Sequence, residues 1–229
     1  MSLFRKKSPT PEEQAFQSAL SEQFDRPDGD DGDDPADDSA EPETDVAPDD
    51  DGITRLDFGA LRVPGVDGME VRAELDDEQQ VVGVAVMLDE TVLQLQAFAA
   101  PKSEGLWDEV RQEIAEGIRG GQGKAREVDG PFGRELQAEV VVAAEDGAEG
   151  RQSVRFIGRD GERWFLRGVV TGAGVADAAR AQGVESVFEG VRVERGTHAA
   201  PPRDPLPLSL PDNASTEGGP QGVDDPSEA

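Results

Sequence analysis

Residues 152–171, QSVRFIGRDGERWFLRGVVT, decide the fold that the sequence predicts. Two runs rich in valine, isoleucine and aromatic residues flank the pair Asp160-Gly161, which is typical of the two-residue type I′ turn of a β-hairpin. Counting outward from this turn predicts three facing pairs: Arg159 with Glu162, Ile157 with Trp164, and Phe156 with Phe165. We therefore expect two antiparallel strands here.

The segments before this hairpin favour further antiparallel strands. Residues 69–75 and 92–99 alternate apolar and polar side chains, and residues 81–88 form a more continuous apolar run. Short links join these segments, as in a meander. Other strand patterns lie at 61–64, 125–128, 136–142 and 191–193.

Two segments predict helices. Residues 103–119 begin with Ser103 as a possible N-cap and have an apolar stripe made of Leu106, Trp107, Val110, Ile114 and Ile118. Residues 176–190 form an alanine-rich helical segment with a break at Gly183. We therefore expect an α+β fold, in which an antiparallel sheet of about six or seven strands packs against two helical segments.

Charge divides the chain into four parts. Residues 25–51 hold 14 acidic residues against one basic residue, within a chain of net charge -28. We expect an amphipathic helix at 1–24, a disordered acidic linker at 25–52, the α+β domain at 53–195, and a proline-rich exit with a disordered tail at 196–229.

The amphipathic helix has a defined apolar side. Thr10 is a suitable N-cap, and Phe16, Leu20 and Phe24 recur at helical spacing. One interpretation is a short helix that docks on a partner. The other is a marginal helix that frays, because about 14 residues barely hold a helix alone in water.

The residue inventory excludes several chemistries. The sequence has no cysteine and one histidine, His198, so thiolate chemistry, a histidine-rich metal site and a Ser-His-Asp triad are not expected. The strong acidity argues against binding nucleic acid. Numerous acidic pairs leave a carboxylate-based hydrolase or transferase with a divalent metal as an alternative. We expect no cofactor.

The hairpin also contains the most basic stretch of the domain, with Arg155, Arg159, Arg163 and Arg167. These guanidinium groups could receive an anionic ligand or a carboxylate-bearing partner, the chain's own acidic linker included. Alternatively, their stems cover the sheet. The candidate interaction residues are Phe16, Leu20, Phe24, Arg163, Trp164 and Arg167.

Several stretches resemble a known family. They are LRVP at 61–64, LQLQAFAAP at 93–101, WDEVR at 107–111, GPFG at 130–133, RWFLRG at 163–168 and the exit at 201–211. The set resembles an uncharacterised actinobacterial domain of unknown function, the DUF3710 type. The resemblance implies a cytoplasmic protein and supplies no activity, cofactor or site residue. A late hairpin followed by a helix and a short strand also resembles the Mog1/PsbP type of α+β sandwich.

The function that these observations favour is a non-enzymatic interaction or adaptor module with a protein partner. We expect the protein to be soluble and cytoplasmic, because no run of about 18 apolar residues and no signal-peptide pattern is found. Whether the chain has any enzymatic activity is left open by the sequence.

Overall fold

The computed structural model describes residues 51–76, 78–102, 105–143, 149–197 and 200–211. Seven strands form one antiparallel sheet, the large sheet, in the order β3-β4-β5-β9-β8-β7-β6. This confirms the predicted α+β class with an antiparallel sheet. The strands are β3 (Glu70–Leu75), β4 (Val81–Leu88), β5 (Thr91–Ala99), β6 (Lys124–Gly130), β7 (Gly133–Ala143), β8 (Glu149–Gly161) and β9 (Trp164–Gly172).

Three short strands form a second sheet that the sequence did not predict. This small sheet has the order β1-β2-β10, with β1 at Arg55–Asp57, β2 at Leu61–Pro64 and β10 at Arg192–Val193. Leu61 and Val63 of β2 are completely buried against the large sheet. The small sheet therefore packs over the core on one face of the large sheet and does not extend that sheet.

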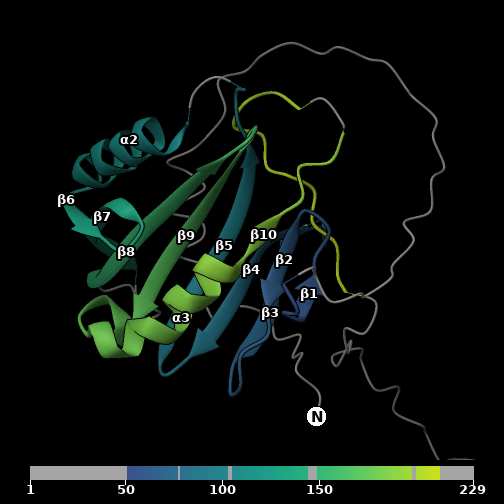
Figure 1. Ribbon diagram of the computed structural model, residues 1–229. Coiled ribbons are helices and arrows are strands. Elements are labelled where there is room, and N and C mark those ends of the chain that lie inside the picture. Colours follow the sequence, from purple (N-terminus) through teal and green to yellow (C-terminus); the bar gives the residue numbers. More distant parts are fainter. Residues whose placement is uncertain (1–50, 77, 103–104, 144–148, 198–199, 212–229) are drawn as a thin grey trace, which may run out of the picture.

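Helices lie on both faces of the large sheet (Figure 1). Helix α2 (Trp107–Gly120) lies along β6, β7 and β8. Helix α3 (Ala178–Gly190) lies on the opposite face beside the small sheet, and a short 3-10 helix, η1 (Ala173–Val175), leads into it. The predicted break at Gly183 is wrong, because α3 continues through it.

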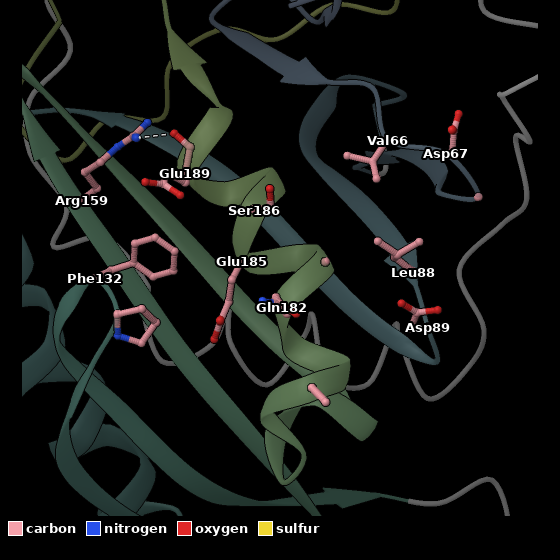
Figure 2. A pocket seen from close by; sticks show the side chains of 14 residues that line it. Val66, Asp67, Leu88, Asp89, Phe132, Arg159, Gln182, Glu185, Ser186 and Glu189 are labelled. Atoms are coloured by element: carbon pink, nitrogen blue, oxygen red, sulfur yellow. Dashed lines mark hydrogen bonds between the residues drawn. The ribbon is translucent and has the colours of Figure 1, made fainter.

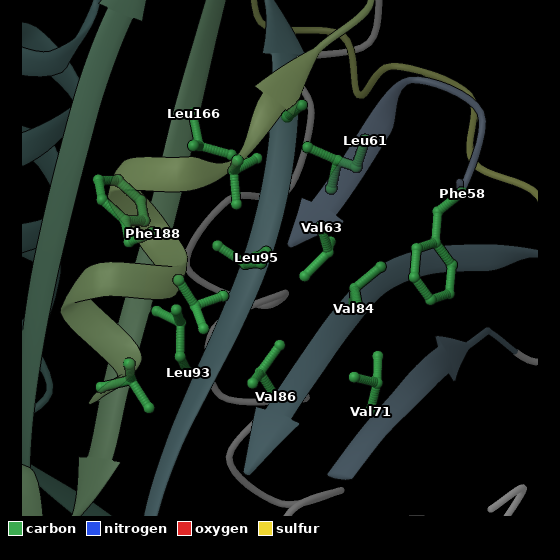
Figure 3. Close-up of a cluster of buried hydrophobic side chains, with 14 of the residues drawn as sticks. Phe58, Leu61, Val63, Val71, Val84, Val86, Leu93, Leu95, Leu166 and Phe188 are labelled. Atoms are coloured by element: carbon green, nitrogen blue, oxygen red, sulfur yellow. The ribbon is translucent and has the colours of Figure 1, made fainter. Parts of the chain in front are cut away.

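Each face of the large sheet has its own hydrophobic core. The core below α3 and the small sheet is shown in Figure 3 and includes Phe58, Leu61, Val63, Val71, Val84, Val86, Leu93, Leu95, Leu166 and Phe188. The core below α2 includes Trp107, Ile114, Ile118, Leu136, Phe156 and Phe165. The sheet thus separates two apolar layers, as its alternating strands require.

The β8–β9 turn lies two residues beyond its predicted place. Gly161 pairs with Trp164, so the turn residues are Glu162 and Arg163 instead of Asp160-Gly161. The predicted facing pairs are therefore wrong, but an even shift leaves every side chain on its predicted face. Gly161 is the last strand residue before the turn, and its lack of a side chain leaves room for the Trp164 ring, since a Cβ atom there would lie 2.0 Å from it.

The contacts of Asp160 explain why the turn lies beyond its predicted position. Its carboxylate accepts hydrogen bonds from the backbone nitrogens of Leu106 (2.7 Å) and Trp107 (3.2 Å) at the start of α2. Leu106, at the N-cap position, has no side chain that can accept such a bond. Asp160 is thus a capping residue supplied by the hairpin, and the expected cap Ser103 lies outside the described residues.

We predict that Asp160→Ala lowers the free energy of unfolding by about 1 kcal/mol, because the first turn of α2 loses its acceptor. Urea unfolding of the full chain measures this. Glu162→Ala, which changes the adjacent turn, is the matched control. Equal stability of the two variants would show that Asp160 does not cap α2.

Candidate functional site

Arg159 holds the C-terminal end of α3. Its guanidinium donates hydrogen bonds to the backbone oxygens of Glu189 (2.9 Å) and Val191 (2.6 Å). Arg55 of β1 donates to the adjacent oxygen of Gly190 at 2.8 Å. The last carbonyls of a helix have no partner inside it and carry partial negative charge, so both arginines satisfy and neutralise this end.

The surroundings of Arg159 are aromatic and partly closed to solvent. The guanidinium lies 5.6 Å from the centre of the Trp164 ring and 5.9 Å from that of Phe188. Burial, helped by the charge of Arg192, lowers the pKa of Arg159 below its ordinary value. Because its guanidinium hydrogen bonds go to the end of α3, Arg159 stabilises the fold rather than offering its charge to a ligand.

Arg155 forms a second link between the hairpin and α3. It pairs with Glu185 of α3, and its Nε lies 3.4 Å from Glu135 of β7. Glu135 is only 1% exposed. Burial raises the pKa of this carboxyl above its ordinary value, although the charge of Arg155 opposes the shift.

The last acid of the linker also binds arginine. Asp51 pairs with Arg55 at 2.9 Å and with Arg192 at 3.0 Å. The hydrogen bond from Arg55 is the largest of the effects that hold the pKa of Asp51 well below its usual range. The chain therefore enters the described domain at the arginines beside the end of α3.

The structure does not bring the predicted interaction residues together. Arg163 is an exposed turn residue, and Trp164 is half-buried on the α3 side. Arg167 lies on the opposite face and is 8% exposed, 5.2 Å from the centre of the Phe98 ring. Burial lowers the pKa of Arg167 to about 10. Phe16, Leu20 and Phe24 lie outside the described residues.

A broad depression of about 1110 Å³ lies along both flanks of α3 (Figure 2). On one flank stand Val66 and Asp67 of the β2–β3 loop, Leu88 at the end of β4 and Asp89 of the β4–β5 turn. On the other flank stand Phe132, Arg159 and Glu185. Gln182, Ser186 and Glu189 of α3 lie between the flanks.

Side chains on both flanks of the depression pack closely against α3. Gly183 allows Leu88 to approach the helix, since a Cβ atom at Gly183 would lie 2.4 Å from Leu88 Cδ2. Phe132, in the β6–β7 turn, packs edge-on against Phe188 at 4.8 Å between ring centres. The side chains that line the depression are therefore held by the core, although they come from distant parts of the sequence.

The depression is acidic. The carboxylates of Asp67, Asp89 and Glu189 line it and make no hydrogen bond or ion pair with the residues that the structure describes. Sequence reasoning missed these three residues because turn and surface acids are common and nothing in the sequence distinguishes them. Their grouping around apolar Val66 and Leu88 arises only in the folded chain.

Two further observations concern classes of function. Across the described ranges, no three or more histidine, aspartate or glutamate side chains are grouped so that they could hold a metal ion. Neither α2 nor α3 is long and apolar enough to cross a membrane.

The fold defines an α+β domain with helices on both faces of a large antiparallel sheet. Over residues 35–217 the chain matches a family model described as "Protein of unknown function (DUF3710)", and it belongs to this family. This confirms the resemblance that the sequence indicated.

Among solved structures, the chain is similar to cyanobacterial PsbP (CyanoP) from Synechocystis sp. PCC 6803. The identity is 11%, the TM-score is 0.34, and the alignment covers 69% of this chain and 98% of that chain. The likeness is a loose one of fold and says nothing of function. No curated protein was found to match the chain.

We predict that Arg159→Met lowers the free energy of unfolding by about 2 kcal/mol, because charged hydrogen bonds to the end of α3 are lost. Hydrogen exchange should show faster opening at the last turn of α3. Arg163→Met is the control, since that side chain is exposed in the turn. Similar exchange in both variants would contradict the role given to Arg159.

A second prediction concerns pH. The raised pKa of Glu135 means that its carboxyl group binds a proton more tightly in the folded protein than in the unfolded chain. The stabilisation is therefore fully present below the ordinary value of 4.5 and is lost as the pH rises through the raised value. Wild type should lose stability relative to Glu135→Gln as the pH increases from 4.5.

Urea unfolding at a series of pH values measures this difference. Glu116→Gln, at an exposed position of α2, is the control for the loss of one carboxyl group. Parallel curves of wild type and Glu135→Gln would show that burial does not raise the pKa of Glu135.

Proposed function

We propose that this protein is a non-enzymatic interaction module, and that it binds a protein partner in the depression along α3. The observation on which the proposal rests is the combination of apolar Val66, Leu88 and Phe132 with the carboxylates of Asp67, Asp89 and Glu189. Apolar side chains supply contact area, and the exposed carboxylates attract a cation.

The chemistry of the partner follows from this lining. A segment in which lysine or arginine alternates with leucine or phenylalanine could place apolar groups beside Leu88 and cations beside Asp67 and Asp89. The hairpin arginines support the same choice, because Arg155 and Arg159 make their contacts with α3. An acidic partner would find few cations to meet in this depression.

A labelled peptide of that composition tests the proposal by fluorescence anisotropy with the full chain. The double variant Asp67→Lys/Asp89→Lys should bind roughly tenfold more weakly, because two exposed ion pairs of up to about 1 kcal/mol each are lost. Raising the salt concentration should weaken the wild-type complex, since exposed charges are screened.

The control carries the same change of net charge elsewhere. Glu78→Lys/Glu116→Lys alters two exposed acids away from the depression and should bind like wild type. Equal affinities of all three proteins would show that the depression is not the binding surface. Equal weakening in both double variants would show that only net charge attracts the peptide.

A further inference from the structure

The charge of the depression along α3 is one-sided. Its lining has one base, Arg159, and four acids, which are Asp67, Asp89, Glu185 and Glu189 (Figure 2). Of these acids, Asp67, Asp89 and Glu189 are exposed. A segment that is attracted to this surface by charge must therefore be basic.

The arginines around the depression make their contacts within the domain. Arg159 donates hydrogen bonds to the backbone at the end of α3. Arg155 pairs with Glu185, and Arg180 of α3 pairs with Glu90. These contacts offset part of the negative charge of this surface, but the exposed acids of the lining still suit a basic segment from outside the described domain.

Only one part of the chain outside the described residues has a net positive charge. Residues 1–9 contain Arg5, Lys6 and Lys7 and no acid. Residues 10–50 contain 16 acids and one base, and residues 212–229 contain five acids and no base. The short ranges 77, 103–104, 144–148 and 198–199 contain no lysine or arginine. Charge therefore selects the start of the chain and excludes its other undescribed parts.

We propose that residues 3–7 of this same chain, Leu-Phe-Arg-Lys-Lys, occupy the depression along α3. Two apolar residues followed by three cations match a lining that places Val66 and Leu88 beside Asp67 and Asp89. The inference rests on the proposed function, because it names an occupant for the same depression. It adds that the chain competes with the partner for its own binding surface.

The point at which the chain enters the domain agrees with this occupant. Asp51 is anchored in a smaller cleft, and Arg159 and Glu189 line both this cleft and the depression. Residues 8–50 can extend over roughly 140 Å, so they easily allow residues 3–7 to return to α3. The tether also raises the effective concentration of the segment, so that a contact too weak for a free peptide is populated within the chain.

A nitroxide spin label tests the inference in the full-length chain. The sequence has no cysteine, so Ser8→Cys provides a single site of attachment. The label should selectively broaden the backbone amide NMR signals of Asp67, Asp89 and Gln182, which line the depression. The double variant Asp67→Lys/Asp89→Lys should reduce the broadening at Gln182 several-fold, because the attraction becomes a repulsion.

Ser215→Cys is the matched control, because it carries the same label in the acidic segment 212–229. It should leave the signals of the depression unchanged. Equal broadening from both labels, or none from the label at position 8, would overturn the inference. So would broadening that appears only when spin-labelled protein is mixed with an unlabelled, isotope-enriched copy, since the occupant would then come from a second chain.

Peptide binding separates this inference from the proposed function. The triple variant Arg5→Gln/Lys6→Gln/Lys7→Gln should bind the fluorescent basic peptide several-fold more tightly than wild type, because the internal competitor is weakened. Unchanged affinity would overturn the inference and leave the proposed function standing. Selective broadening in a chain that binds no peptide would support the docking of residues 3–7 and overturn the proposed function.

Discussion

The arrangement of both helices depends on one pair of adjacent residues at the tip of the β8–β9 hairpin. Because successive side chains of a strand point to opposite faces, Arg159 reaches the end of α3 while Asp160 reaches the start of α2. Each charge is opposite to the partial charge of the helix end that it meets. A single strand thereby anchors one helix on each face of the large sheet.

This constraint decides which groups remain for a partner. Arg159 donates hydrogen bonds to the backbone oxygens of Glu189 and Val191, and Arg155 pairs with Glu185. These two arginines of the hairpin therefore hold α3 in place. The surface next to it is acidic instead, with Asp67 and Asp89 beside apolar side chains. The candidate site is therefore opposite in charge to the one that the arginines of the sequence indicated.

The strand faces were predictable, whereas the turn was not. Alternation within 152–171 correctly assigned Phe156 and Phe165 to one face and Trp164 to the other, because that pattern is local. The pair Asp160-Gly161 is a good turn by itself, but here the aspartate caps α2 and the glycine accommodates the Trp164 ring. Both demands come from residues that are distant in sequence or in the next strand.

By itself, the sequence determined the α+β class, the main strands and helices, and the lack of any cysteine, since these follow from local periodicity and residue inventory. Only the tertiary structure decided the small sheet, the position of the hairpin turn and the acidic depression. The physical reason is that Val66, Leu88 and Phe132 come from a loop, the end of a strand and a turn that are far apart in the sequence. Packing against α3 brings these residues to one surface, and no short stretch of sequence predicts that they lie close together.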